Sequence, residues 1–165
     1  MIVRYVLRAA LVLILACFVV SGCSRKIVKP GPVGQGPVGP LSSGQIAEQE
    51  LQTMQAELKI IYFDFDKYTL SPEAQSALQY NAELLKRAPQ VQVTAEGHCD
   101  ERGTAEYNLA LGERRARAVM DFLVSLGIPP QRIQTVSYGS ECPVDSGHNE
   151  EAWSKNRRVF LRVSR

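Results

Sequence analysis

The stretch from Lys29 to Gly44 is the feature that most constrains how this chain can fold. It reads KPGPVGQGPVGPLSSG and contains the unit GPVG twice. Because proline favours extended backbone and glycine interrupts it, such a stretch forms a flexible linker that cannot bury a core. A short polar helix is expected over 45–56. We therefore predict that the linker region ends at residue 57, and that one folded domain occupies residues 58–165.

The first 22 residues have the three-part build of a secretory signal. Arg4 and Arg8 precede an apolar run over 9–20 that is too short to span a bilayer comfortably. The letters VSGC, ending at Cys23, resemble a bacterial lipobox, in which cleavage leaves the cysteine to receive diacylglycerol. We expect a signal peptide over 1–22 and a lipidated N-terminus with its tether over 23–57. The alternative is ordinary secretory cleavage, with Cys23 left as a free thiol or a disulfide partner.

Charge and cysteine content exclude several classes of protein. The chain has 19 Lys+Arg and 17 Asp+Glu, and the leader removes two arginines and no acid, so the remainder is formally neutral. A nucleic-acid binder would carry a concentrated basic excess, so no nucleic-acid partner is expected. No ligand spacing for a metal exists, and we expect neither a metal nor a cofactor. Cys99 and Cys142 could form a disulfide in an oxidising compartment or remain two thiols.

Hydrophobic periodicity alternates along residues 58–165. Ser71 and Pro72 form a helix start, and Gly127 is placed to end a helix. Strands are expected over 59–65, 91–98, 133–138 and 157–163, and helices over 72–87, 105–126 and 150–154. The order β-α-β-α-β-(α)-β predicts a two-layer α+β domain, with helices packed on a mixed four-stranded sheet.

An arginine interrupts the apolar face of the second of these helices. Arg115 falls inside the stripe that Leu111, Val119 and Leu123 define at helical spacing. A guanidinium on a core-facing side must find an anion or remain in water. Asp100, in the loop before this helix, could form an internal salt bridge with Arg115. Alternatively, Arg115 could bind a ligand carboxylate while Asp100 accepts from a ligand ammonium, a pair suited to a zwitterion.

Four motifs together resemble the OmpA-like C-terminal domain family, and with the lipobox and tether they resemble its peptidoglycan-associated lipoproteins. They are YFDFD at 62–66, GHCDERGTAEYNLALGERRA at 97–116, SYG at 137–139 and SKNRRV at 154–159. The resemblance implies non-covalent binding of the diaminopimelate in peptidoglycan stem peptides, with Asp100 and Arg115 as principal contacts. The matching positions that line or brace the pocket are Arg102, Leu111, Asn108 and Asp66. For Asn108, a buried amide that holds backbone is an equally good interpretation.

The resemblance also implies a location and partners. It places the protein in the outer membrane, sorted there by Ser24, with its domain in the periplasm and TolB and other Tol proteins as partners in envelope integrity and cell division. One alternative is a wall-binding relative without Tol engagement. A cell-wall hydrolase is another, but it would need a catalytic acid, a metal or an activated nucleophile. His98, Cys99 and Asp100 are adjacent, yet neighbours in an extended segment point to opposite faces, so no enzymatic activity is expected.

Overall fold

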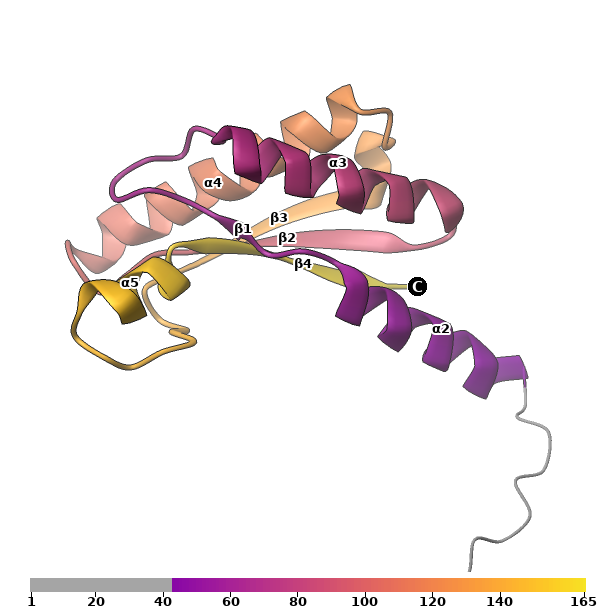
Figure 1. Ribbon diagram of the computed structural model, residues 1–165, viewed down its shortest axis with the longest axis horizontal. Coiled ribbons are helices and arrows are strands. Elements are labelled where there is room, and N and C mark those ends of the chain that lie inside the picture. Colours follow the sequence, from indigo (N-terminus) through magenta and orange to yellow (C-terminus); the bar gives the residue numbers. More distant parts are fainter. Residues whose placement is uncertain (1–42) are drawn as a thin grey trace, which may run out of the picture. The chain divides into compact units, whose positions relative to one another are not determined.

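The computed structural model describes residues 43–165. The predicted signal peptide, the lipidation site at Cys23 and most of the tether lie outside these residues. Figure 1 shows the described elements, whose bounds are as follows. They are α2 Ser43–Glu57, β1 Ile61–Tyr62, α3 Pro72–Arg87, β2 Gln92–His98, α4 Ala105–Ser125, η2 Pro130–Arg132, β3 Ile133–Gly139, α5 Glu150–Asn156 and β4 Arg158–Ser164.

The strands form one mixed sheet in the order β1-β4-β2-β3. β2 and β3 run parallel, whereas β4 is antiparallel to both β1 and β2. α3 and α4 cover one face of the sheet, and α2 and α5 lie toward the other side (Figure 1). This arrangement confirms the predicted α+β class with helices on a mixed four-stranded sheet.

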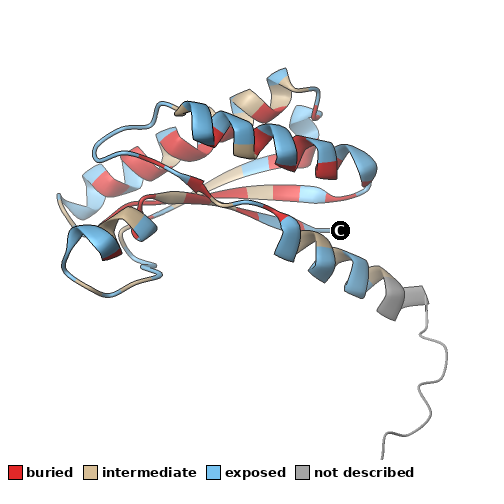
Figure 2. Ribbon diagram, viewed as in Figure 1, coloured by how far each residue is buried: buried red, intermediate tan, exposed pale blue. Residues whose placement is uncertain are grey.

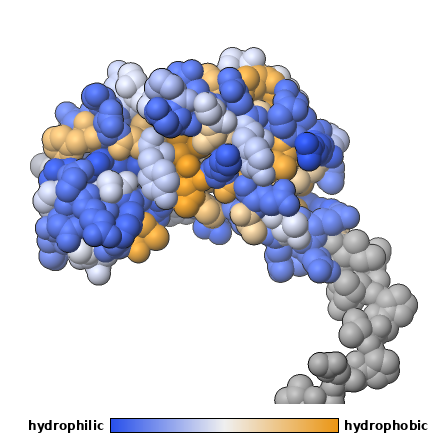
Figure 3. All heavy atoms as spheres, viewed as in Figure 1, coloured by the Kyte–Doolittle hydropathy of each residue, from blue (hydrophilic) through white to orange (hydrophobic). Residues whose placement is uncertain are grey.

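The core lies between α3, α4 and the sheet, where the buried residues concentrate (Figure 2). Fully buried side chains include Leu78, Leu85, Val119, Leu123, Val159 and Leu161. α4 approaches β2 backbone to backbone, because a Cβ on Gly97 would lie 2.0 Å from the Gly112 carbonyl oxygen. In the same orientation, hydrophilic residues cover much of the surface, and hydrophobic ones gather near its centre (Figure 3).

Local signals explain where the two long helices begin and end. The Ser71 hydroxyl accepts a hydrogen bond from the Ala74 N–H at 3.2 Å, and Thr104 accepts one from the Tyr107 N–H at 3.2 Å. Gly127, just after α4, has φ +96°, a left-handed conformation that glycine adopts without strain. The predicted helix starts and the glycine stop are therefore confirmed.

The first strand is much shorter than the predicted 59–65. Only Ile61 and Tyr62 pair with β4, and the Phe63 N–H adds one bond to the Arg157 carbonyl at 2.9 Å. The chain then turns, with the Lys67 N–H bonded to the Asp64 carbonyl and Asp66 at φ +58°. The residues of this segment have high β-propensity, but the turn takes residues 64–67 off the sheet and toward α4.

α2 matches the polar helix expected over 45–56, and it packs against the sheet. The Gln55 side-chain amide donates to the Leu161 carbonyl at 2.9 Å and accepts from the Val163 N–H at 3.0 Å. Leu51 and Met54 pack against the core. The compact unit therefore extends upstream of residue 58.

A buried arginine joins three segments where the parallel strands begin. Arg132 Nε donates to the Val91 carbonyl at 2.9 Å, and Nη2 donates to the Leu85 and Ala88 carbonyls at 3.0 and 2.8 Å. Burial lowers the pKa of Arg132 from its ordinary value, although a guanidinium stays protonated in proteins. Arg132 thus satisfies carbonyls at the end of α3 and before β2.

Candidate functional site

A cavity of about 210 Å³ lies where β2 ends and α4 begins. All six residues predicted to bind or brace the ligand line it, namely Asp66, Asp100, Arg102, Asn108, Leu111 and Arg115. Phe65, Cys99, Gly103 and Tyr107 complete the wall. The structure therefore brings together residues that are up to 50 positions apart in the sequence.

Arg115 is fully buried at 0% exposure and reaches this cavity from α4. Its Nε donates to the Lys67 carbonyl at 2.8 Å, Nη1 to the His98 carbonyl at 2.8 Å, and Nη2 to the Asp64 carbonyl at 3.2 Å. Nothing in this set of acceptors carries a full negative charge. The turn that ends β1 is thus tied to the end of β2 by a guanidinium whose charge is not neutralised by its hydrogen-bond partners.

Asp100 is also buried, but its carboxylate is paired. Oδ1 accepts from the Arg102 N–H at 3.1 Å and from Arg102 Nε at 3.2 Å, while Oδ2 accepts from Arg102 Nη2 at 2.7 Å and Arg157 Nη1 at 3.3 Å. Burial by itself would raise the pKa of Asp100, but the hydrogen bonds from Arg102 and Arg157 outweigh it and lower this pKa. Asp100 is therefore a fixed anion.

The internal salt bridge considered between Asp100 and Arg115 is not formed. Within residues 43–165, the ion pairs of Asp100 are with Arg102 and Arg157, and Arg115 has none. The two side chains instead line one cavity, the acid from the loop and the base from the helix. The geometry thus retains the second interpretation, in which both charges face a ligand space.

Arg102 lies between two aromatic rings. Its guanidinium carbon is 4.0 Å from the centroid of Phe65 and 4.2 Å from that of Trp153. Such stacking holds a planar guanidinium by cation–π attraction while leaving its edge free to hydrogen-bond. Arg102 therefore connects the β1 turn, the loop after β2 and α5.

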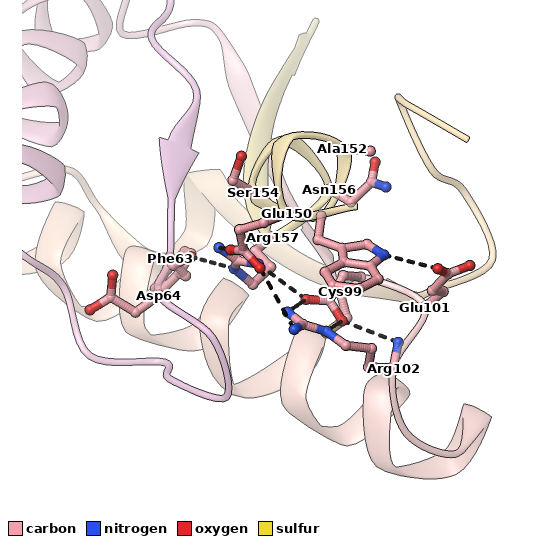
Figure 4. Close-up of polar contacts among 12 residues, drawn as sticks. Phe63, Asp64, Cys99, Glu101, Arg102, Glu150, Ala152, Ser154, Asn156 and Arg157 are labelled. Carbon is pink, nitrogen blue, oxygen red and sulfur yellow. Dashed lines mark hydrogen bonds and ion pairs between the residues drawn. The ribbon is translucent and has the colours of Figure 1, made fainter. Parts of the chain in front are cut away.

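Arg157 and Glu150 belong to this site, although the sequence did not single them out. Arg157 donates to the Phe63 carbonyl at 3.1 Å and to Glu150 Oε1 at 2.6 Å, besides its bond to Asp100 (Figure 4). The last strand was expected to begin at residue 157, but β4 begins only at Arg158, so Arg157 lies just before the strand. The available signal was the SKNRRV motif itself, which places an arginine just before the strand.

The other predicted residues have clear structural roles. Asn108 is buried, and its amide donates to the Asp100 carbonyl at 3.2 Å and the Arg102 carbonyl at 3.1 Å. It therefore holds the loop backbone, as the second interpretation of this residue stated. Leu111 forms an apolar part of the wall, and the exposed Asp66 accepts a hydrogen bond from the Tyr107 hydroxyl.

The disulfide considered between Cys99 and Cys142 is absent, and both are free thiols. Cys99 is buried in the cavity wall, where its thiol donates to the Asn108 carbonyl at 3.3 Å and accepts from Arg115 Nη1 at 3.4 Å. Cys142 is exposed. The structure thus agrees with the second alternative, two free thiols, a choice that sequence spacing could not make because it carries no information on the distance between two loops.

His98 is a packing residue. It is buried and stacks on Tyr138 with ring centroids 5.3 Å apart. Burial lowers its pKa to about 4, with Arg158 adding to the effect, so the imidazole is neutral at physiological pH. No hydrogen-bond partner for its Nδ1 exists in the part of the chain that the structure describes.

Comparison with known proteins agrees with this geometry. A peptidoglycan-associated lipoprotein of Agrobacterium fabrum is 43% identical over 139 residues, covering 84% of this chain and 78% of that protein. One of Pseudomonas aeruginosa is 54% identical over 101 residues, covering 61% of this chain and 60% of its own length. The crystal structure of the peptidoglycan-associated lipoprotein from Burkholderia pseudomallei matches with a TM-score of 0.62 and 45% identity, covering 64% of this chain and 90% of that one.

The sequence profile of the OmpA family matches residues 62–157, which include every element from α3 to α5 and all the cavity residues. Profile, relatives and solved structure agree with the motifs, the topology and the cavity described above. The chain belongs to the OmpA family.

Proposed function

We propose that this chain is an outer-membrane lipoprotein that binds peptidoglycan non-covalently and so links the outer membrane to the cell wall. Relatives at 43% and 54% identity bear the name peptidoglycan-associated lipoprotein. The family is non-enzymatic, which argues against the cell-wall hydrolase considered as an alternative. The protein then acts as an adaptor between two surfaces.

The observation that carries this proposal is the buried, unneutralised Arg115 in the wall of a small cavity. A guanidinium in such a place favours a ligand carboxylate, because its charge is not neutralised and, within residues 43–165, one of its five N–H groups, on Nη2, has no acceptor. Asp100 in the same wall favours a ligand ammonium. Diaminopimelate carries an ammonium and a carboxylate on one carbon, so its free end matches this pair. In this proposal Arg102, Leu111, Asn108 and Asp66 shape or brace the pocket.

The anchor and the partners extend the proposal beyond the described residues. Lipidation at Cys23 would hold the protein in the outer membrane, with the domain facing the periplasm. None of the helices in residues 43–165 has the length and apolar character needed to cross a membrane. The family resemblance supports a role in the Tol-Pal system, with TolB as the partner. Wall binding without Tol proteins remains the second candidate.

Sedimentation with purified cell-wall sacculi tests the wall-binding function. The full chain in detergent should sediment with sacculi, free diaminopimelate should release it, and no soluble wall fragments should appear. Arg115→Lys should weaken sedimentation strongly, because an ammonium has only three donors and cannot hold the three carbonyls and a ligand carboxylate at the same time. Arg132→Lys makes the same change at a buried arginine away from the cavity and should leave sedimentation unchanged. Equal binding by wild type and Arg115→Lys would place the site elsewhere, and wall fragments would favour a hydrolase.

A further inference from the structure

The carboxylate of Asp100 is saturated in the free protein. A carboxylate has about four lone-pair sites, and Asp100 accepts four hydrogen bonds, three from Arg102 and one from Arg157. A ligand ammonium can therefore bond to Asp100 only if an existing donor leaves. This requirement applies to any amine that enters the cavity.

Arg102 is the donor placed to leave. The Arg157 side chain is only 8% exposed and is also held by the Phe63 carbonyl and Glu150. The Arg102 side chain is 30% exposed and lines the cavity. The Arg102 backbone N–H is fixed by the loop, so the exchange concerns the two side-chain bonds, from Nε at 3.2 Å and Nη2 at 2.7 Å.

A second carboxylate, that of Glu150, lies close enough to bind Arg102 after it leaves Asp100. Glu150 Oε2 lies 3.6 Å from Arg102 Nη1, and the other oxygen of Glu150 holds Arg157 at 2.6 Å. Figure 4 shows Glu150 and Arg157 on the side of Arg102 that faces α5. The guanidinium carbon lies over both the Phe65 and the Trp153 ring, so a small movement toward Glu150 can keep both cation–π contacts.

We infer that the Arg102 side chain is an internal stand-in for the ligand's ammonium, and that binding exchanges it from Asp100 to Glu150. The inference rests on the proposed function, since it concerns the same cavity. It makes Arg102 a specificity-determining residue. A simple amine must displace the bidentate Arg102 guanidinium from Asp100 and forms no other charged contact in return. A zwitterion must do the same, but its carboxylate also binds Arg115. A simple carboxylate binds Arg115 and leaves Arg102 in place.

Two probes that differ only in their amino groups test the exchange, namely meso-diaminopimelate and pimelate. Both are titrated calorimetrically into the full chain in detergent. Arg102→Met keeps an unbranched side chain between the rings but cannot donate. This variant should bind diaminopimelate about tenfold more tightly, because the ligand ammonium no longer competes with a charge-assisted bond from Arg102 to Asp100. It should bind pimelate within about twofold of wild type. Arg117→Met, at an exposed arginine of α4, should change neither affinity.

A second measurement follows ligand binding in the wild type itself, and a variant serves only to assign one resonance. The Arg102 Nε–H resonance, assigned by its loss in Arg102→Lys, should shift on adding diaminopimelate and stay in place on adding pimelate. Glu150→Gln should weaken diaminopimelate binding several-fold, since it removes the receiving charge. A resonance that ignores both probes, or an Arg102→Met variant that loses affinity for both by the same factor, would overturn the exchange. A wild type that binds neither the probes nor sacculi would instead overturn the proposed function.

Discussion

Arg132 and Arg115 lie at opposite ends of the parallel pair β2–β3, and each donates to three backbone carbonyls. Arg132 joins the end of α3 to the segment before β2, whereas Arg115 joins the turn after β1 to the end of β2. Only Arg115 also lines the cavity. The comparison teaches that burial and carbonyl bonding alone indicate a structural role for an arginine, and that access to a cavity beside a second fixed charge distinguishes Arg115, the arginine that we propose binds the ligand.

The strongest test of this comparison replaces each arginine by leucine. Both Arg115→Leu and Arg132→Leu leave three carbonyls without their donor, so each should lower the free energy of unfolding by about 3 kcal/mol. Only Arg115→Leu should also reduce binding to sacculi, by about 100-fold or more, because the carboxylate contact is charge-assisted and buried. Denaturant titration gives the first effect, and sedimentation at a temperature where both variants are folded gives the second. Loss of wall binding in Arg132→Leu alone would reverse our assignment.

The dependence of stability on acid should also differ between the Asp100 end and the Arg132 end of the sheet, by less than the effect of the leucine substitutions. The pKa of Asp100 is lowered in the folded state, so its stabilisation is present above the ordinary Asp pKa of about 4 and is lost as pH falls through the lowered value. Asp100→Asn should be less stable than wild type at pH 7, and the gap should close as pH falls from about 4 toward 2. Arg132→Leu should keep the wild-type acid profile, since the acceptors of Arg132 are uncharged. The readout is the melting temperature across this range; parallel profiles for wild type and Asp100→Asn would show that Asp100 is not a fixed anion.

Thiol labelling offers the mildest test. Cys142 is exposed and should react rapidly, while buried Cys99, whose pKa burial raises, should react only when the Arg115 end opens locally. Diaminopimelate should slow the labelling of Cys99 several-fold and leave Cys142 unaffected. Mass spectrometry of peptides after timed alkylation measures each rate separately. Fast labelling of Cys99 that ignores diaminopimelate would mean that its end of the sheet is open or that the ligand binds elsewhere.

The sequence contained much of the fold because its strongest signals are local. The N-cap Ser71, the stop at Gly127 and the apolar stripe of α4 each depend on residues within one element, and the structure agrees with them. The same stripe placed Arg115 on the core-facing side, and the resemblance to the family then pointed to six of the ten residues that line the cavity.

The features that could not be predicted from the sequence depend on contacts between segments that are far apart along the chain. Arg157 meets Asp100 across 57 positions, and Arg115 meets Asp64 across 51. The shortening of β1 follows from a turn stabilised partly by these contacts rather than from the propensity of its residues. The structural role of Arg132 could not be predicted, because its acceptors are backbone carbonyls and no pattern of side chains in the sequence indicates them. The saturation of Asp100 likewise required the positions of two arginines at once.

The bonds of Gln55 have a consequence for where the protein can be divided. β1 covers only the first part of β4, so the outer edge of β4 near Leu161 and Val163 is completed by the amide of Gln55 in place of a strand. A fragment that began at residue 58 would lack this amide and the apolar side chains of Leu51 and Met54. It would present an open strand edge next to uncovered apolar surface, the combination that promotes edge-to-edge association. A fragment that begins before Ser43 keeps the edge covered and is the one to prefer for work in solution.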